Sequence, residues 1–391
     1  MINASTRRAS SPAVKLGQPD HLLLLVVGTL ILIGLEVVFS STFALALGEH
    51  DNVFHYLLMQ GLWAVIGSAL LVVFMKIDYH LWLKLSPILV VLAIISLILV
   101  LLPFMSVAQY GAARWIRLGP LPAIQPSEFV KLAIVIGLAS WFSGPAKRTQ
   151  TFKDGLLPFV VFLALITVLI MEQPDMGTTL VVTLTATTMF FLAGADLRLI
   201  FAMGGVGFAG VIAVAAGASY RVSRFQSFLD PWQDPSGVGY HIIQLLIALG
   251  SGGLFGLGVG ASRQKFSYVP GAHTDGVFAI IGEEMGFVGC VVILALFSAL
   301  LYRGARIAQR APDSQGALLA CGIIAWFGFQ ALINVAGITR SLPLTGIPLP
   351  FISYGGSALA ATMAAVGILL NISRQAVPEQ EPADNFDTRS R

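Results

Sequence analysis

The sequence predicts an all-α polytopic membrane protein with about ten transmembrane helices, and composition and apolar spacing carry the prediction. Hydrophobic residues make up 56% of the chain and charged residues only 11%, and the mean hydropathy is +0.84. An ordinary soluble domain has about 25% charged residues. The apolar residues fall into separate runs, and a bilayer core of about 30 Å needs about 20 of them per helix.

Two polar tails flank the apolar runs. Residues 1–20 and 376–391 are interpreted as flexible cytoplasmic tails, and residues 21–375 as one transmembrane domain. The run 22–47 is longer than a signal-peptide core, which predicts a retained first span. The predicted spans are 21–47, 54–75, 84–106, 128–143, 155–172, 176–193, 198–217, 276–302, 315–338 and 354–373.

The basic residues predict the orientation in the membrane. An even number of spans puts both termini on one side, and if that side is the cytoplasm, most of the 23 Lys and Arg residues lie in the inner loops and tails. Nothing in this pattern suggests nucleic acid. A few basic residues lie against the bias, in outer loops or within a span, and these suggest an anionic ligand. Among them are Arg114, Lys131, Arg221, Arg224 and Lys265.

A large extracytoplasmic loop is predicted between the seventh and eighth spans, from about residue 218 to 275. A connection of this length is expected to be functional. Within it, Tyr240–Gly250 is apolar but too short to cross a membrane, which predicts a re-entrant or interfacial half-helix. Residues 250–260 are rich in glycine. Two interpretations of these glycines stay open: flexible packing at the membrane edge, or a backbone cradle for phosphate.

Acids occur where an apolar run begins. Asp275 stands at the entrance of the predicted span 276–302, and Glu283 and Glu284 lie about two turns inside it. Ionisable residues within a span are costly and mark functional sites by default.

Other charged residues have a structural explanation beside a functional one. Glu128 and Lys131 stand three residues apart at a helix start, so a self-neutralising ion pair and ligand contact both stay open. Asp175 follows Pro174 in a tight turn and is predicted mainly to cap the next helix. The pair Arg221 and Arg224 lies at helical spacing, which suits either headgroup snorkelling or diphosphate binding.

Residues 342–357 contain three prolines and three glycines between two apolar runs. A continuous helix is excluded there, and irregular backbone at membrane depth predicts a cavity wall. Motifs for a P-loop, a zinc helix and a nucleophile elbow are missing from the sequence, so no nucleotide is expected.

These segments together resemble the SEDS family of peptidoglycan polymerases, the FtsW and RodA type, over residues from about 20 to 375. Ser262-Arg-Gln-Lys265 and Trp232 are closer to the division branch, FtsW. Two positions depart from the family pattern, since Gly271 and Gly276 stand where an acid and a large apolar residue are usual. The motifs that carry the resemblance are Ala113–Gly119, Gln125–Lys131, Glu172–Gly177, Phe228–Pro231, Gly250–Gly253, Ser262–Lys265, His273–Asp275, Gly282–Glu284 and Leu349–Gly356.

The resemblance implies a glycosyltransferase that joins lipid II to a lipid-linked glycan at the outer face of the bacterial cytoplasmic membrane, in septal wall synthesis. It implies Asp275 as the base for the acceptor hydroxyl. It implies contacts to substrate from Arg114, Lys131, Arg221, Arg224, Lys265, His273 and Ser353, and supporting roles for Glu128, Glu283, Glu284 and Asp175. A divalent cation, Mg or Mn, is an open addition whose ligands are unknown.

The implied partners are lipid II, the lipid-linked glycan, membrane lipids, a class B penicillin-binding protein with transpeptidase activity, and other divisome or elongasome proteins. Two alternative functions stay open. A bundle with buried charges and broken helices also suits a transporter that flips lipid II. A divisome scaffold without catalysis is the other alternative.

Overall fold

The computed structural model describes residues 17–102, 106–109, 112–117, 122–143, 151–198, 226–237, 239–265 and 269–376. Most of the two predicted tails, nearly all of the predicted span 198–217, and the candidates Arg221 and Arg224 lie outside these residues.

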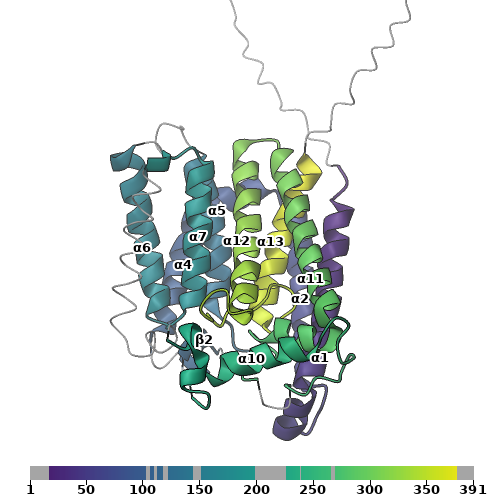
Figure 1. The fold of residues 1–391 in the computed structure, drawn as a ribbon. Helices are drawn as coiled ribbons and strands as arrows, with labels where there is room; N and C mark the ends of the chain where they lie inside the picture. Colours follow the sequence, from purple (N-terminus) through teal and green to yellow (C-terminus); the bar gives the residue numbers. More distant parts are fainter. Residues whose placement is uncertain are drawn as a thin grey trace, which may run out of the picture.

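The described chain forms a bundle of long helices (Figure 1). Six helical stretches are long and apolar enough to cross a membrane, and they are α1 (His21–His50), α2 (His55–Lys76), the π-helical turn η1 (Phe152–Leu156) with α6 (Leu157–Met171), α11 (Val277–Gln309), α12 (Ser314–Ile338) and α13 (Gly356–Gln375). Beside them run α4 (Ser86–Val100), α5 (Pro126–Phe142) and α7 (Met176–Leu192), and the short α3 (Tyr79–Lys84) precedes α4. The predicted all-α polytopic membrane fold is confirmed.

Two predicted spans have wrong ends. The span 84–106 overshoots, because α4 ends at Val100 and the chain then forms an antiparallel hairpin of β1 (Ser106–Gln109) and β2 (Ala112–Ile116). Pro103 follows α4 in the sequence and cannot continue a helix. The span 276–302 is too short, since α11 continues to Gln309. Ala, Arg and Gln favour helix, so the helix outlasts its apolar run.

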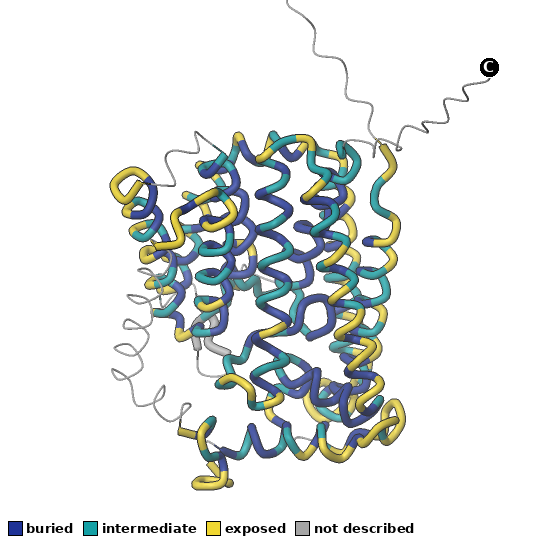
Figure 2. The backbone as a smooth tube through the Cα atoms, turned by 45° about the horizontal axis from the view of Figure 1, so that its top comes forward, coloured by how far each residue is buried: buried dark blue, intermediate teal, exposed yellow. Residues whose placement is uncertain are grey.

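α13 lies at the centre of the bundle, where buried residues gather (Figure 2). It packs closely against α2, because a glycine of each helix lies against the other helix. A Cβ at Gly67 would lie 2.5 Å from Met363 Sδ, and a Cβ at Gly367 would lie 2.5 Å from Leu71 O. Close approach through small residues is a usual way for helices to associate in lipid. The outer faces instead expose large apolar side chains such as Leu25, Leu32 and Val65, which suits contact with lipid.

The two ends of the described chain meet at one end of the bundle. Gly17 N–H donates to Arg374 O at 2.7 Å, and Arg303 donates to Asp20 at 2.6 Å. Both ends of the described chain therefore lie at the same end of the bundle. At the opposite end, α10 (Tyr240–Ser251) lies across the bundle (Figure 1), as the predicted half-helix requires, and it contacts the one-turn η2 (Pro231–Gln233).

Candidate active site

Asp275 lies just before the start of α11, on a loop that is tightly shaped around its carboxylate. The residue is half-buried, and Oδ1 accepts a 3.0 Å hydrogen bond from the Thr274 hydroxyl. Gly271 has φ +64°, and a Cβ there would collide with Asp275 Oδ1. Gly346 has φ +74°, and a Cβ there would lie 3.5 Å from Oδ2. The glycine at 271, which departs from the family pattern, therefore makes room for the carboxylate.

The connection 339–355, between α12 and α13, packs against this loop. Tyr354 N–H donates to His273 O at 2.8 Å, which ties the connection to the loop of Asp275. The Ser353 hydroxyl accepts from Leu349 N–H at 2.8 Å, within its own turn, and Gln60 of α2 donates to Ser353 O at 3.3 Å. The predicted helix break is confirmed, and the broken segment lies against the backbone of His273, two residues before Asp275.

His273 contributes a buried ring near Asp275. Its ring centroid lies 5.7 Å from that of Tyr56 and 5.6 Å from that of Tyr354. Burial lowers the pKa of His273, against the opposing effect of the charges on Asp275 and Glu49. The imidazole is therefore neutral at physiological pH, with one nitrogen to donate and one to accept a hydrogen bond.

Lys131 and Glu128 form a buried ion pair at the start of α5. The Lys131 ammonium lies 2.9 Å from each oxygen of the Glu128 carboxylate and donates to Gln330 Oε1 at 2.7 Å. It also lies 5.2 Å from the centre of the Trp326 ring. The interpretation of these two residues as an ion pair is confirmed, and protein groups surround the ammonium.

Lys265 and Glu284 form a second buried pair, on the side of α11 that faces α1. The Lys265 ammonium donates to Glu284 at 3.2 Å, to the Ser40 hydroxyl at 3.1 Å and to Gly260 O at 2.6 Å. Ser40 also donates to Glu284 at 2.7 Å. Within the described part of the chain, no hydrogen bond joins this cluster to Asp275. The structure therefore pairs the Lys265 ammonium with the Glu284 carboxylate.

Glu283 holds the loop that precedes Lys265. Its carboxylate accepts from the Ser262 hydroxyl at 2.5 Å and from Arg263 N–H at 2.9 Å. Glu283 is 1% exposed and Glu284 is 3% exposed. Both acids therefore support the 252–265 loop.

The glycine-rich loop is inserted into a break in α11. Gly286 has φ +69° and ψ −165°, so the helix is interrupted there. In a continuous helix, the N–H groups of residues 287 and 288 would donate to the carbonyls of residues 283 and 284. At this break, each of these four backbone groups bonds to the loop backbone. This supports the packing interpretation of the glycines, in a specific form. The four bonds run from Phe287 N to Gly253 O (2.9 Å), Val288 N to Leu254 O (3.1 Å), Leu257 N to Glu283 O (2.9 Å) and Gly258 N to Glu284 O (3.0 Å).

Arg114 and Asp175 both contribute to the turn between α6 and α7, through different contacts. Asp175 caps α7 as predicted, since its carboxylate accepts from Thr178 N–H at 3.0 Å and from the Thr178 hydroxyl at 2.9 Å. Arg114, on β2, donates to Gln173 O at 3.0 Å and to Pro174 O at 2.5 Å. Its guanidinium thus lies at the same end of the bundle as the connection 339–355, which packs against α7 at Gly177.

Several buried polar residues were missed by the sequence analysis. Gln60, Gln330 and Asn334 lie within apolar helices and hydrogen-bond to the connection 339–355. The sequence does contain a signal for these three residues. An uncharged amide within a span is unusual because, like a charge, it is costly to place in the apolar core of a membrane. Only the charged residues were singled out.

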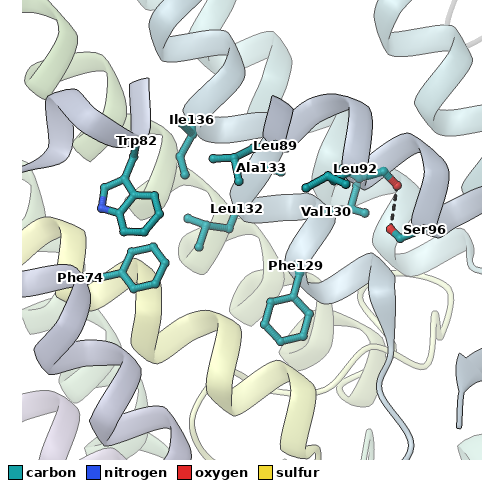
Figure 3. Close-up of a pocket in the computed structure, with 11 residues that line it drawn as sticks. Phe74, Trp82, Leu89, Leu92, Ser96, Phe129, Val130, Leu132, Ala133 and Ile136 are labelled. Carbon is teal, nitrogen blue, oxygen red and sulfur yellow. Dashed lines mark hydrogen bonds between the residues drawn. The ribbon is translucent and has the colours of Figure 1, made fainter. Parts of the chain in front are cut away.

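Clusters of metal-binding side chains and cavities are two further places where a reaction site could lie. Among the described residues, no three His, Cys, Asp or Glu side chains are placed to hold a metal ion. An apolar cavity of about 290 Å³ lies between α2, α3, α4 and α5 (Figure 3). Its Ser96 hydroxyl bonds to Ala93 O at 2.7 Å, and Phe74 stacks on Trp82. The cavity is large enough for hydrocarbon, and no ionisable side chain lines it.

The fold and its buried charges define a polytopic membrane protein with a carboxylate site at one end of the bundle. The chain belongs to the FtsW/RodA/SpoVE family, whose model, described as "Cell cycle protein", matches residues 20–377. Stage V sporulation protein E of Bacillus subtilis is 44% identical over 358 residues, or 91% of this chain and 97% of that protein. The probable peptidoglycan glycosyltransferase FtsW of Trichlorobacter lovleyi is 41% identical, over 92% of this chain and 94% of the relative.

Solved structures share this fold. A chain from a peptidoglycan synthase complex, described as coordinating polymerization and crosslinking, matches with a TM-score of 0.73 and 27% identity, over 92% of this chain and 99% of that chain. The rod shape determining protein RodA of Thermus thermophilus matches with a TM-score of 0.67 and 27% identity, over 92% and 98%. The resemblance predicted from the sequence motifs is confirmed.

Proposed function

We propose that this protein is a peptidoglycan glycosyltransferase that joins the disaccharide units of lipid II into glycan strands. The observation that carries the proposal is the placement of Asp275. It is a half-buried carboxylate on a loop fixed to the connection 339–355, in a chain whose relatives are named peptidoglycan glycosyltransferases.

In the proposed reaction, the C4 hydroxyl of the acceptor sugar attacks the anomeric carbon of the donor. A bond forms between the hydroxyl oxygen and that carbon, and the bond from the carbon to the lipid diphosphate breaks. Asp275 takes the hydroxyl proton as general base, and undecaprenyl pyrophosphate leaves with the electron pair. Our candidate for a hydrogen bond near this centre is the neutral imidazole of His273, which lies close enough to Asp275 to feel its charge.

The leaving diphosphate needs positive charge. Arg114 is our candidate for direct contact, because a guanidinium matches phosphate oxygens and this one is only partly buried. Lys131 and Lys265 are buried in ion pairs, which favours an indirect role. Arg221 and Arg224 stay candidates outside the described residues.

A divalent cation stays part of the proposal only as an ion carried by the diphosphate. In the part of the chain that the structure describes, no group of three His, Cys, Asp or Glu side chains is arranged to hold such an ion. Such an ion would supply charge to the diphosphate oxygens.

We place the protein in the cytoplasmic membrane with both termini inside, from the distribution of basic residues. We further propose septal wall synthesis and a class B penicillin-binding protein as partner. The similarity to a chain of a complex that coordinates polymerization and crosslinking supports such a partner.

Purified protein with lipid II in detergent tests the proposal, because a micelle has no second leaflet. Glycan polymer is the expected product. Lipid II movement across vesicles without polymer in detergent would instead favour the transporter. If the protein forms no polymer even with its transpeptidase partner, the catalytic proposal is wrong and the scaffold is favoured.

A further inference from the structure

Asn334 joins the Asp275 loop to the connection 339–355. Its side-chain amide donates to Asp275 O at 3.0 Å and to Ile347 O at 2.8 Å. The residue is 4% exposed. Both amide hydrogens are therefore used, one on each segment that borders the Asp275 carboxylate.

Gln330 lies one turn earlier on the same face of α12. Its side-chain amide donates to Pro348 O at 2.9 Å, next to the carbonyl that Asn334 holds. Its carbonyl oxygen accepts from the Lys131 ammonium at 2.7 Å and from Trp326 Nε1–H at 2.8 Å. Gln330 is fully buried.

These contacts form one continuous path through the protein interior. The path runs from the Glu128–Lys131 pair on α5, through Gln330 and the carbonyls of residues 347 and 348, to Asn334 and Asp275. The helix α12 thus holds two irregular segments that lie outside the helices of the bundle. Catalytic side chains keep their geometry when such supporting contacts lock the backbone beneath them.

We propose that Asn334 and Gln330 form a carboxamide clamp on α12 that positions Asp275 for glycosyl transfer. Asn334 is the positioning residue, because it holds the Asp275 backbone directly. Gln330 fixes the neighbouring carbonyl and links the clamp to Lys131. The inference rests on the proposed function of Asp275.

The test compares Asn334→Leu with Asn371→Leu in the purified full chain, using lipid II polymerisation and thermal unfolding. Asn371 is a matched control, since it is also buried and holds two backbone groups, donating to Met75 O at 2.8 Å and accepting from Tyr79 N–H at 3.0 Å. It lies in the last turns of α13, close to the bond between Gly17 N–H and Arg374 O, whereas Asp275 precedes the start of α11.

Both variants should lose similar stability, but only Asn334→Leu should lose turnover. We expect its kcat per folded molecule to fall about ten- to a hundredfold, with KM for lipid II changed less than about threefold. Asn334→Thr keeps one donor and should have an intermediate kcat. If Asn334→Leu does not fold, the kcat of Asn334→Thr alone tests the clamp. A kcat for Asn334→Thr and any folded Asn334→Leu that equals the Asn371→Leu value overturns the clamp.

Asp275→Asn, measured alongside, separates this inference from the function on which it rests. An inactive Asp275→Asn with normal Asn334 variants would remove the clamp and leave the proposed function intact. An active Asp275→Asn would remove the role of Asp275, and the clamp with it.

Discussion

The Lys265 ammonium and the Glu284 carboxylate lie 3.2 Å apart inside the bundle, and each side chain is at most 5% exposed. The pair joins the 252–265 loop to α11. Removing one partner of a buried pair leaves an uncompensated charge, which typically costs about 3–5 kcal/mol.

Glu284→Gln should therefore lower the free energy of unfolding by about 3–5 kcal/mol. The double variant Lys265→Met with Glu284→Gln removes both charges and should recover most of the loss. Thermal unfolding in detergent measures both effects. The pairing account is contradicted if the single variant is as stable as the wild type, or if the double variant is no better than the single.

The break in α11 predicts a strong difference between two glycines. Gly286 has a positive φ, and a Cβ there would lie 2.6 Å from backbone atoms of Leu254. Gly286→Ala should cost at least about 1–3 kcal/mol from backbone strain alone.

Gly250 supplies the control. It is helical, and a Cβ there would meet nothing within 4 Å. Gly250→Ala should be neutral or stabilise by up to about 1 kcal/mol. Equal stability losses from Gly286→Ala and Gly250→Ala, measured by denaturation, would show that the break does not need its glycine.

The sequence predicted most spans because the length of an apolar run reports directly on membrane crossing. It also predicted the Asp175 cap, and it gave the Glu128–Lys131 pair as one of two interpretations; the partners in each lie three residues apart. Local spacing determines such contacts.

Contacts between distant segments could not be predicted in this way. Asn334 and Asp275 are separated by 59 residues, and Lys131 and Gln330 by 199 residues. Lys265 appeared to be a free outer cation until the fold brought Glu284 to it. The glycine-rich loop is likewise explained only by a helix break about 30 residues later in the chain, at Gly286.

A charged cluster near the chain ends predicts a pH dependence. His80 Nδ1 lies 2.7 Å from Asp78 and Nε2 lies 2.8 Å from Asp313. Burial acts to lower the pKa of His80, but the hydrogen bonds and charges of the two acids outweigh it and raise the pKa. Burial acts to raise the pKa of Asp78 and of Asp313, but hydrogen bonds to backbone and to His80 lower both values.

His80 should therefore stabilise the fold fully below about pH 6.5, its unfolded value, and lose this effect as the pH rises through its raised folded value. Asp78 and Asp313 should stabilise the fold above about pH 3.9, their unfolded pKa, and lose this effect as the pH falls through their lowered folded pKa values. The Tm difference between wild type and His80→Gln should be largest near about pH 5 to 6 and shrink toward about pH 9. A difference that is constant over this range would contradict the assignment.

The tight fit of Gly271 against Asp275 predicts an effect on activity. Gly271→Ala introduces a Cβ that displaces the carboxylate, and turnover should fall about ten- to a hundredfold. Gly194 also has a positive φ, of +87°, but open space around it. Gly194→Ala should cost a similar strain, about 1–2 kcal/mol, without changing turnover. Polymerisation rates that fall equally in the two variants would attribute the effect to strain alone.

The most direct test of the account is the rate of lipid II polymerisation by purified Asp275→Asn. Asparagine keeps the size of the side chain and cannot take the proton, so the variant should keep the Tm of the wild type and lose about 10²–10⁴-fold in rate. A rate within about twofold of the wild type would contradict the assignment of Asp275 as the base.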